Sequence, residues 1–165
     1  ASGAGQLHTV PQADIDRVMS VNFGTVVNMC RETMPALLTG KGKAIVNIAS
    51  VAGMLAHGNS AYGPSKAAVI QLTSELAVMY GRDGIRANCV APGPVRTKLA
   101  MAVHTPEIID AYHDAIPLNR YGNEREIGEV IFFLCSEKAS FVTGQVVAAD
   151  GGFEATGVGL PALRV

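Results

Sequence analysis

The chain has 165 residues, 48% of them hydrophobic and 16% charged, with a formal net charge of −1. This composition fits one folded domain with a sizeable core and excludes an intrinsically disordered chain. The 13 basic and 14 acidic side chains form no basic stripe of the kind that binds nucleic acid, and no apolar run reaches the length of a membrane span.

Three isolated cysteines, Cys30, Cys89 and Cys135, form no CxxC pair. They are typical of reduced thiols in a cytoplasmic protein rather than of a disulfide framework or a zinc site. Residues 1–10 are Gly-rich and lack the charged and apolar regions of a signal peptide. Because the first residue is Ala, we expect the chain to begin partway through a longer gene product.

Apolar residues at three- and four-residue steps predict a long helix over residues 11–38, with Pro11 suited to its first turn and Gly40 and Gly42 ending it. The apolar run 44–49 contains β-branched residues and is typical of a strand buried on both faces of a parallel sheet. The elements expected after it are a loop at 51–59, a helix at 60–80, a strand at 85–90, proline-interrupted helical patterns at 97–120, a helix at 124–136 and a strand at 145–149.

This alternation of helix and strand predicts an α/β fold, with a parallel sheet between helices on both faces in a three-layer arrangement. The chain shows no internal repeat and no linker, so residues 1–165 are expected to form a single domain. Ligands bind such sheets at the carboxyl ends of the strands. The residues expected at that rim are Ser50, Tyr62, Lys66, the Pro92-Gly93 turn and Asp150.

Tyr62 and Lys66 are four residues apart on a predicted helix, so both lie on one helix face. An ammonium group beside a phenol favours the phenolate and lowers a tyrosine's pKa from its ordinary value of about 10. Such a tyrosine serves as a general acid/base near neutral pH. Ser50 precedes Tyr62 by 12 residues, and this spacing favours a catalytic role over a cap of the next turn.

Five motifs in this order resemble those of the classical short-chain dehydrogenases/reductases, and the match runs from about Asp14 to Phe153. YxxxK alone is a weak signal, whereas five motifs at family-like spacing are a strong one. They are Asn22 of the family's tetrad, the active-site Ser50, the YxxxK pair Tyr62 and Lys66, the PG-x-x-x-T turn Pro92-Gly93-Pro94-Val95-Arg96-Thr97, and the closing Asp150-Gly151-Gly152.

The resemblance implies a Rossmann-like fold and an oxidoreductase that interconverts a secondary alcohol and a ketone with NAD or NADP. Tyr62 would exchange a proton with the substrate oxygen, and Ser50 would orient that oxygen. Lys66 would lower the pKa of Tyr62 and bind the nicotinamide ribose, and Asn22 would hold a water that links Lys66 to solvent. The implied cofactor-binding residues are Tyr62, Lys66, Pro92, Gly93, Val95 and Thr97, with Thr97 and the Val95 backbone holding the carboxamide.

The sequence departs from the family's pattern in its first part. The Gly-rich turn that takes the pyrophosphate, and the residue that selects NAD or NADP, have no counterpart. Gly3 and Gly5 give G-x-G without a preceding strand and are not treated as a fingerprint, and Arg96 stands where the family often has Asp. We therefore expect the chain to be the C-terminal, catalytic portion of a longer enzyme.

Other polar and apolar residues leave alternatives open. The spacing of His57, His104 and His113 matches no metal-ligand set, so no metal site is expected. His57 and Asn59 lie between Ser50 and Tyr62 and are candidates for contact with the substrate. One apolar set is either a lid over the substrate or part of the core: Met101, Ile108, Ile109, Tyr112 and Ile116.

Two functions from different classes remain. The first is an oxidoreductase with a small alcohol or carbonyl substrate, for which sugar or polyol, 3-oxoacyl and steroid substrates are all open. The second is a catalytically silent fragment or an oligomerisation module, whose first strand exposes an apolar edge that another segment, a second chain or the N-terminus must cover. The resemblance implies a homodimer or homotetramer, assembled through helices 11–38 and 60–80 and the C-terminal strand.

Overall fold

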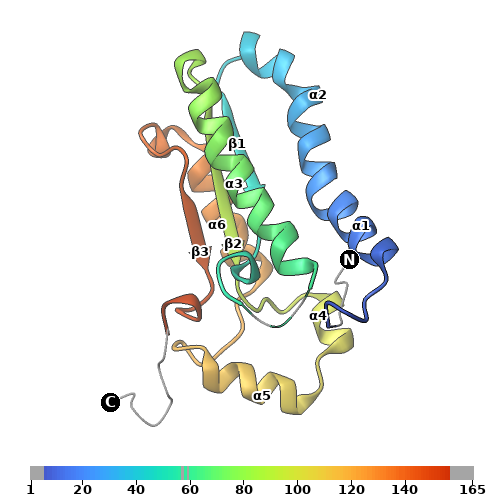
Figure 1. Cartoon of the computed structure of the whole chain (residues 1–165). Coiled ribbons are helices and arrows are strands. Elements are labelled where there is room, and N and C mark those ends of the chain that lie inside the picture. Colours follow the sequence, from blue (N-terminus) through green and yellow to red (C-terminus); the bar gives the residue numbers. More distant parts are fainter. Residues whose placement is uncertain (1–5, 57, 59, 157–165) are drawn as a thin grey trace.

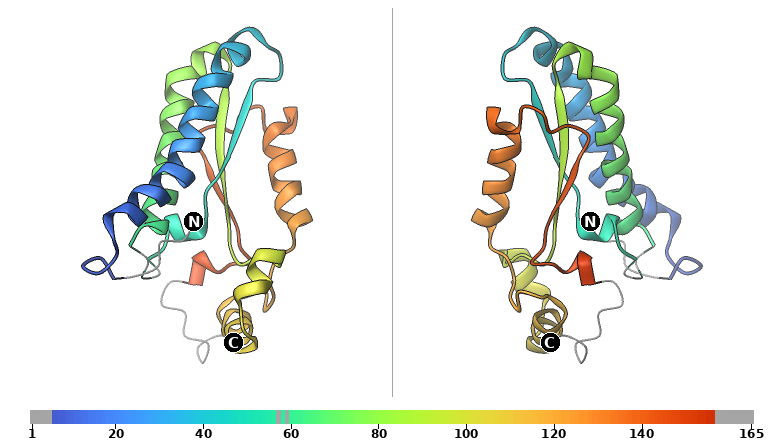
Figure 2. Two further views of the ribbon diagram at one scale, coloured as in Figure 1. Left: turned by 90° about the vertical axis from the view of Figure 1, so that its right-hand side faces the viewer. Right: turned by 90° about the vertical axis from the view of Figure 1, so that its left-hand side faces the viewer.

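The computed structural model describes residues 6–56, 58 and 60–156. Its sheet has three parallel strands in the order β1-β2-β3, with bounds Ala44–Ile48, Arg86–Pro92 and Val146–Ala149. Helices α2 (Thr25–Thr39) and α3 (Tyr62–Tyr80) cover one face, and α6 (Glu124–Cys135) covers the other (Figures 1 and 2). The predicted α/β architecture, a parallel sheet between two helical layers, is confirmed.

The first predicted helix is continuous but not uniform. It consists of α1 (Gln12–Met19), a π-helical turn (Ser20–Gly24) and α2, and Gly40 follows its last residue as expected. The predicted loop after β1 contains a 3₁₀ turn, Val51–Gly53. The proline-interrupted region forms α4 (Lys98–Val103) and α5 (Pro106–Ala115), which lie at the carboxyl end of the sheet (Figure 1).

Strand β2 extends further than predicted. The predicted strand ends at residue 90, whereas β2 ends at Pro92, which pairs with Ala149 of β3. A proline is tolerated at this place because a strand end needs fewer ladder hydrogen bonds than a strand interior. In the described part of the chain β1 lies at the sheet edge and pairs with β2 alone, which leaves its other side open as expected.

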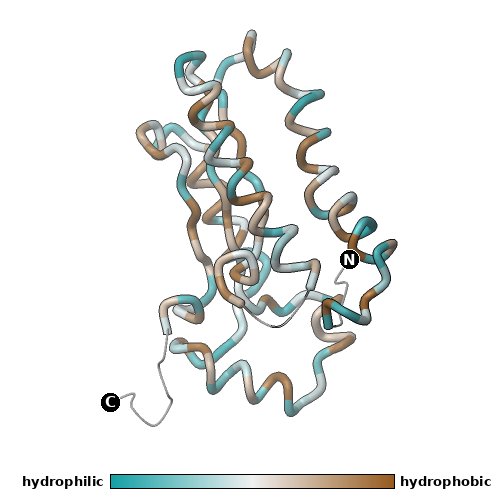
Figure 3. Tube along the Cα trace, viewed as in Figure 1, coloured by the Kyte–Doolittle hydropathy of each residue, from teal (hydrophilic) through white to brown (hydrophobic). Residues whose placement is uncertain are grey.

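The core lies around the central strand. Ala87, Cys89, Val90 and Ala91 of β2 are fully buried, and the hydrophobic colours of Figure 3 follow the strands. Burying one valine or isoleucine contributes roughly 1.5–3 kcal/mol to stability. Asn88 is also fully buried, and its side chain bonds Val142 O and Gln145 N at 2.8 and 3.1 Å, so its polar atoms are satisfied. In the described part of the chain, every helix falls short of the length or apolar character that a membrane span requires.

Two glycines permit close backbone approaches beside the rim. A Cβ atom on Gly93 would lie 2.5 Å from Asp150 Cβ, and one on Gly53 would lie 2.7 Å from the backbone carbon of Lys66. Gly93 therefore seats the turn after β2 against the end of β3. Gly53 brings the turn that follows Ser50 against the first part of α3.

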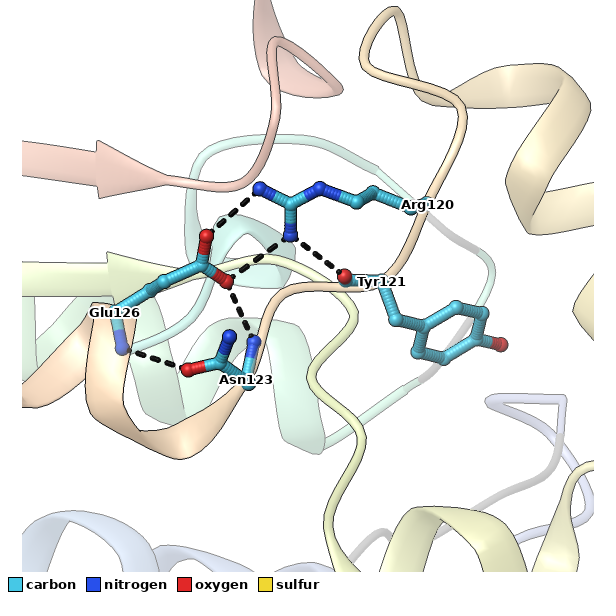
Figure 4. Close-up of polar contacts among 4 residues, drawn as sticks. All are labelled: Arg120, Tyr121, Asn123 and Glu126. Carbon is cyan, nitrogen blue, oxygen red and sulfur yellow. Dashed lines mark hydrogen bonds and ion pairs between the residues drawn. The ribbon is translucent and has the colours of Figure 1, made fainter.

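A polar network fixes the segment that leads into α6 (Figure 4). Arg120 Nη2 and Nη1 donate to the two carboxylate oxygens of Glu126 at 2.7 and 3.1 Å. Glu126 also accepts from the backbone N–H of Asn123, whose side chain accepts from Glu126 N, so the two residues form a capping box. The adjacent Gly122 pairs with the turn after β2, because its N–H donates to Pro94 O at 3.0 Å.

We expect the free energy of unfolding to depend on the ionisation of Glu126 at acidic pH. The Arg120 side chain, followed by the Asn123 N–H, lowers the pKa of Glu126 from 4.5 to about 2. A carboxyl whose pKa is lower in the folded state stabilises the fold above its unfolded pKa, and this contribution is lost as the pH falls from about 4.5 toward 2. Urea unfolding at successive pH values should show this loss in the wild type and a smaller one in Glu126→Gln.

The matched control is Glu129→Gln, in the same helix, because Glu129 has a single, longer contact with Arg125 at 3.5 Å. It should keep the acid dependence of the wild type. Equal acid dependence in the wild type and Glu126→Gln would contradict the role assigned to the network.

We expect Gly93→Ala to destabilise the fold by roughly 1–3 kcal/mol, since the added methyl group meets Asp150 and the backbone must move. Gly128→Ala is the control, because a Cβ on this exposed residue of α6 meets no atom within 4 Å. It should instead stabilise the helix by roughly 0.5–1 kcal/mol. Chemical denaturation measures the free energy of unfolding of both variants. An unchanged value in Gly93→Ala would show that the turn tolerates displacement.

Candidate active site

All of the predicted site residues except Asn22 gather at the carboxyl end of the sheet. One cleft of about 510 Å³ is lined by Ser50 and by the whole predicted cofactor set, Tyr62, Lys66, Pro92, Gly93, Val95 and Thr97. They come from four separate places in the chain: the end of β1, the start of α3, the end of β2 and the start of α4. Parallel pairing places all of these on one rim.

Tyr62 and Lys66 are on one face of the first turns of α3, as their spacing predicts. Lys66 Nζ lies 5.9 Å from the centre of the Tyr62 ring and donates a hydrogen bond of 3.2 Å to Ile48 O, the last carbonyl of β1. Partial burial lowers the pKa of Lys66 below its usual 10.5. The lysine thus ties the helix to the strand while its charge stays beside the phenol.

Ser50 caps a turn and also borders the cleft. It precedes the 3₁₀ turn, and its Oγ accepts a hydrogen bond of 3.2 Å from the backbone N–H of Ala52, so it does cap that turn. Its side chain also borders the cleft beside Tyr62. A hydroxyl that accepts one hydrogen bond still has its own O–H to donate. The cap therefore holds Ser50 in place without using up its donor.

Asn22 is not among the residues that line the cleft. It lies in the π-helical turn, and its Nδ2 donates to Ser65 Oγ at 3.0 Å. Ser65, which is fully buried, donates in turn to Tyr62 O at 2.7 Å. Asn22 thus stabilises the first turn of α3 through its contact with Ser65. Ser65 was missed in the sequence, where its one signal was a small polar residue next to Lys66.

Thr97 has a structural role in addition to its place in the cleft. Its Oγ1 accepts from Ala100 N at 3.1 Å and caps α4, and its N–H donates to Val95 O at 2.8 Å. The Pro92–Thr97 turn is therefore held at both ends, at Gly93 by β3 and at Thr97 by the helix cap. Pro92, Gly93, Val95 and Thr97 of this turn line the cleft of about 510 Å³.

A second cavity of about 230 Å³ adjoins the first. Residues that border both cavities are Ser50, Tyr62, Gly93, Pro94 and His104. The other lining residues are Val51, Ala52, Leu55, Ala56, Tyr112 and Phe153. His104 was weighed in the sequence as a metal ligand alone, and nothing in its spacing signalled this position.

The remaining candidates divide by location. In the set predicted as lid or core, Tyr112 borders the second cavity, whereas Ile116 is buried in the core. His57 and Asn59 lie outside the described residues. Within the part of the chain that the structure describes, no three His, Cys, Asp or Glu side chains gather as a metal site would require.

The family model described as enoyl-(acyl carrier protein) reductase matches residues 1–154. Among curated relatives, 2-(R)-hydroxypropyl-CoM dehydrogenase of Xanthobacter autotrophicus is 40% identical over 93% of this chain and 62% of its own length. The A-factor type gamma-butyrolactone 1'-reductase of Streptomyces virginiae is also 40% identical, over 92% of this chain and 61% of the relative.

Two solved structures agree with these relatives. A gluconate 5-dehydrogenase from Burkholderia cenocepacia in complex with NADP and tartrate has a TM-score of 0.86 and 31% identity over 92% of this chain and 60% of that one. A short-chain type dehydrogenase/reductase from Mycobacterium ulcerans has a TM-score of 0.88 and 29% identity, over 97% and 61%. This chain spans about three fifths of the length of the relatives, 62% and 61% for the two curated ones. On these matches, the chain belongs to the short-chain dehydrogenase/reductase family.

Proposed function

We propose that the protein containing this chain is an NAD- or NADP-dependent oxidoreductase that interconverts a secondary alcohol and a ketone. The observation that carries this is the position of Tyr62 and Ser50 where two cavities adjoin. The larger cleft suits the nicotinamide end of a cofactor, and the smaller cavity suits a substrate. Relatives named as dehydrogenases and reductases, one solved with NADP and another with NADH, support the same reading.

The proposed chemistry follows from three side chains. When bound, the nicotinamide supplies or accepts the hydride. Tyr62 Oη donates its proton to the substrate oxygen as the alcohol forms, and takes it back in the opposite direction. Ser50 Oγ–H, held by the Ala52 cap, donates to the same oxygen and stabilises the charge that develops on it.

Lys66 acts on Tyr62 through its charge. After the phenol releases its proton, the ammonium 5.9 Å from the ring centre attracts the phenolate. Partial burial strengthens this attraction, since fewer water molecules screen it. The Ile48 carbonyl holds the lysine in place, and the contacts from Asn22 through Ser65 to Tyr62 O hold the helix start. Asn22 is thus proposed as a positioning residue, whose further role is to hold a water near Lys66.

The second candidate is a catalytically silent portion of the fold that serves in assembly. It is favoured by the open edge of β1 and by exposed apolar side chains on α2 and α3, with Met29, Val78 and Met79 being 59%, 81% and 55% exposed. A homodimer or homotetramer would cover such side chains. The assembly and the oxidoreductase function are compatible, because the site lies at the strand ends and these side chains lie on the helices.

We expect Tyr62→Phe in the complete gene product to lower kcat by about 10²–10⁴-fold, because the phenyl ring has no proton to transfer. Steady-state oxidation or reduction, followed by nicotinamide absorbance, measures the effect. Tyr80→Phe removes a hydroxyl from the last residue of the same helix and should leave kcat unchanged. Circular dichroism melting should show both variants folded, and full activity in Tyr62→Phe would refute its role.

We expect an isolated polypeptide of residues 1–165 to bind NAD(H) and NADP(H) weakly or not at all. The cleft offers contacts for the nicotinamide end, whereas the sequence has no Gly-rich turn after a strand to hold the pyrophosphate. Isothermal titration of this polypeptide with each of the four dinucleotides checks the expectation. Micromolar binding would show that these residues form a cofactor site by themselves.

A further inference from the structure

We propose that the cavity of about 230 Å³ takes a compact, mostly apolar ketone or alcohol that carries a second oxygen acceptor, and that His104 selects it by a hydrogen bond from Nε2. This inference rests on the proposed function, because it assigns the reacting oxygen to Ser50 and Tyr62. His104 is then a specificity-determining residue at the same site.

The volume of the cavity limits the size of the ligand. An apolar cavity of roughly 150 Å³ holds one benzene ring. A cavity of about 230 Å³ therefore has room for one ring with small substituents, and a fused steroid skeleton or a long acyl chain would extend out of it. Among the substrate classes that the sequence left open, the cavity therefore disfavours steroids and long 3-oxoacyl chains.

The walls of the cavity limit the polarity of the ligand. Among the residues that the structure describes, the lining side chains other than those of Ser50, Tyr62, Tyr112 and His104 are apolar, and they include Val51, Leu55, Ala56 and Phe153. A hydroxyl group buried against such walls without a partner costs roughly 1–3 kcal/mol. A polyol with many hydroxyl groups is thus disfavoured, whereas one acceptor beside His104 is paired.

Contacts with neighbouring residues fix the position of His104, as a residue that selects a ligand requires. It follows the last residue of α4, and its N–H donates to Ala100 O at 2.9 Å. Its ring stacks on Tyr112 with centroids 5.5 Å apart, and its Nδ1 lies 3.0 Å from Tyr121 Oη. Because Nδ1 is engaged, Nε2 is the ring nitrogen that remains for a ligand.

Tyr121 Oη is the hydrogen-bond partner of His104 Nδ1, and the tautomer of His104 follows from which of the two groups donates. The phenol is 5% exposed, and its burial, with Tyr112 nearby, raises its pKa, so it stays protonated. We assign the Tyr121 O–H as the donor to Nδ1, which places the ring N–H of His104 on Nε2. His104 then presents a donor to the cavity, and the group that complements a donor is an acceptor oxygen.

The test uses the complete gene product and compares cyclic ketones that differ by one ring atom. Cyclohexanone is matched with tetrahydropyran-3-one and tetrahydropyran-4-one, in which an ether oxygen replaces a methylene group. We expect at least one oxygen ring to exceed cyclohexanone by about fivefold in kcat/KM and in affinity measured by NMR titration, as one added hydrogen bond predicts. 4-Phenylcyclohexanone, with its second ring, should bind more weakly than cyclohexanone.

Variants test whether His104 causes the preference for the oxygen-containing rings. His104→Phe keeps an aromatic ring against Tyr112 and should abolish the preference for oxygen while cyclohexanone is still turned over. His104→Gln keeps an N–H donor and should retain part of it. The matched control is His113→Phe, because His113 packs on Tyr121 with ring centroids 5.7 Å apart but does not line the cavity. It should keep the wild-type preference.

Two results would overturn the inference: a wild type that prefers neither oxygen ring, or a preference that survives in His104→Phe. Tighter binding of 4-phenylcyclohexanone than of cyclohexanone would overturn the compact cavity. A protein that binds these ketones but turns over none of them would contradict the proposed function instead. The affinity ratios from NMR would then decide on His104 by themselves.

Discussion

The candidate site depends on the burial of β2 between two parallel neighbours. Side chains of β2 are fully buried, from Ala87 to Ala91, so this strand has little freedom to shift. Its parallel partners end at the same edge, which brings Ser50, the turn after Pro92 and Asp150 to one rim. Helix α3 packs against β2 and carries Tyr62 to that rim. A change in the packing of β2 would therefore displace Tyr62 and the cleft together.

Much of this arrangement could be predicted because it is encoded locally. Helical periodicity, short β-branched runs and the glycines at 40 and 42 mark the elements, and each signal lies within a few residues. Tyr62 and Lys66 share a helix face by their spacing alone, as the structure shows. The end of β2, predicted at residue 90 and found at Pro92, depends on pairing with Ala149, which is 57 residues away from Pro92 and invisible to a local pattern.

The parts that could not be predicted depend on contacts between distant segments. Ser65 matters because Asn22, 43 residues earlier, donates to it. Gly53 matters because the backbone of Lys66 lies where its side chain would be. His104 borders both cavities because α4 and α5 cross the strand ends, and its ring is held by Tyr112 and Tyr121. The spacing of the histidines along the chain, by contrast, was compared only with that of metal ligands and carries no information about this packing.

The π-helical turn at Ser20–Gly24 has a consequence for how the first helix can vary. One residue advances an α-helix by about 100°, so the wider turn offsets the buried side of α1 from that of α2 by roughly this angle. Val18 in α1 and Met34 in α2 are both buried, and Asn22 between them still meets Ser65. Deleting one residue here would make a more regular helix but rotate one half against the other. Local regularity and tertiary contact thus compete in this helix, and length changes are better tolerated in the loops at its ends.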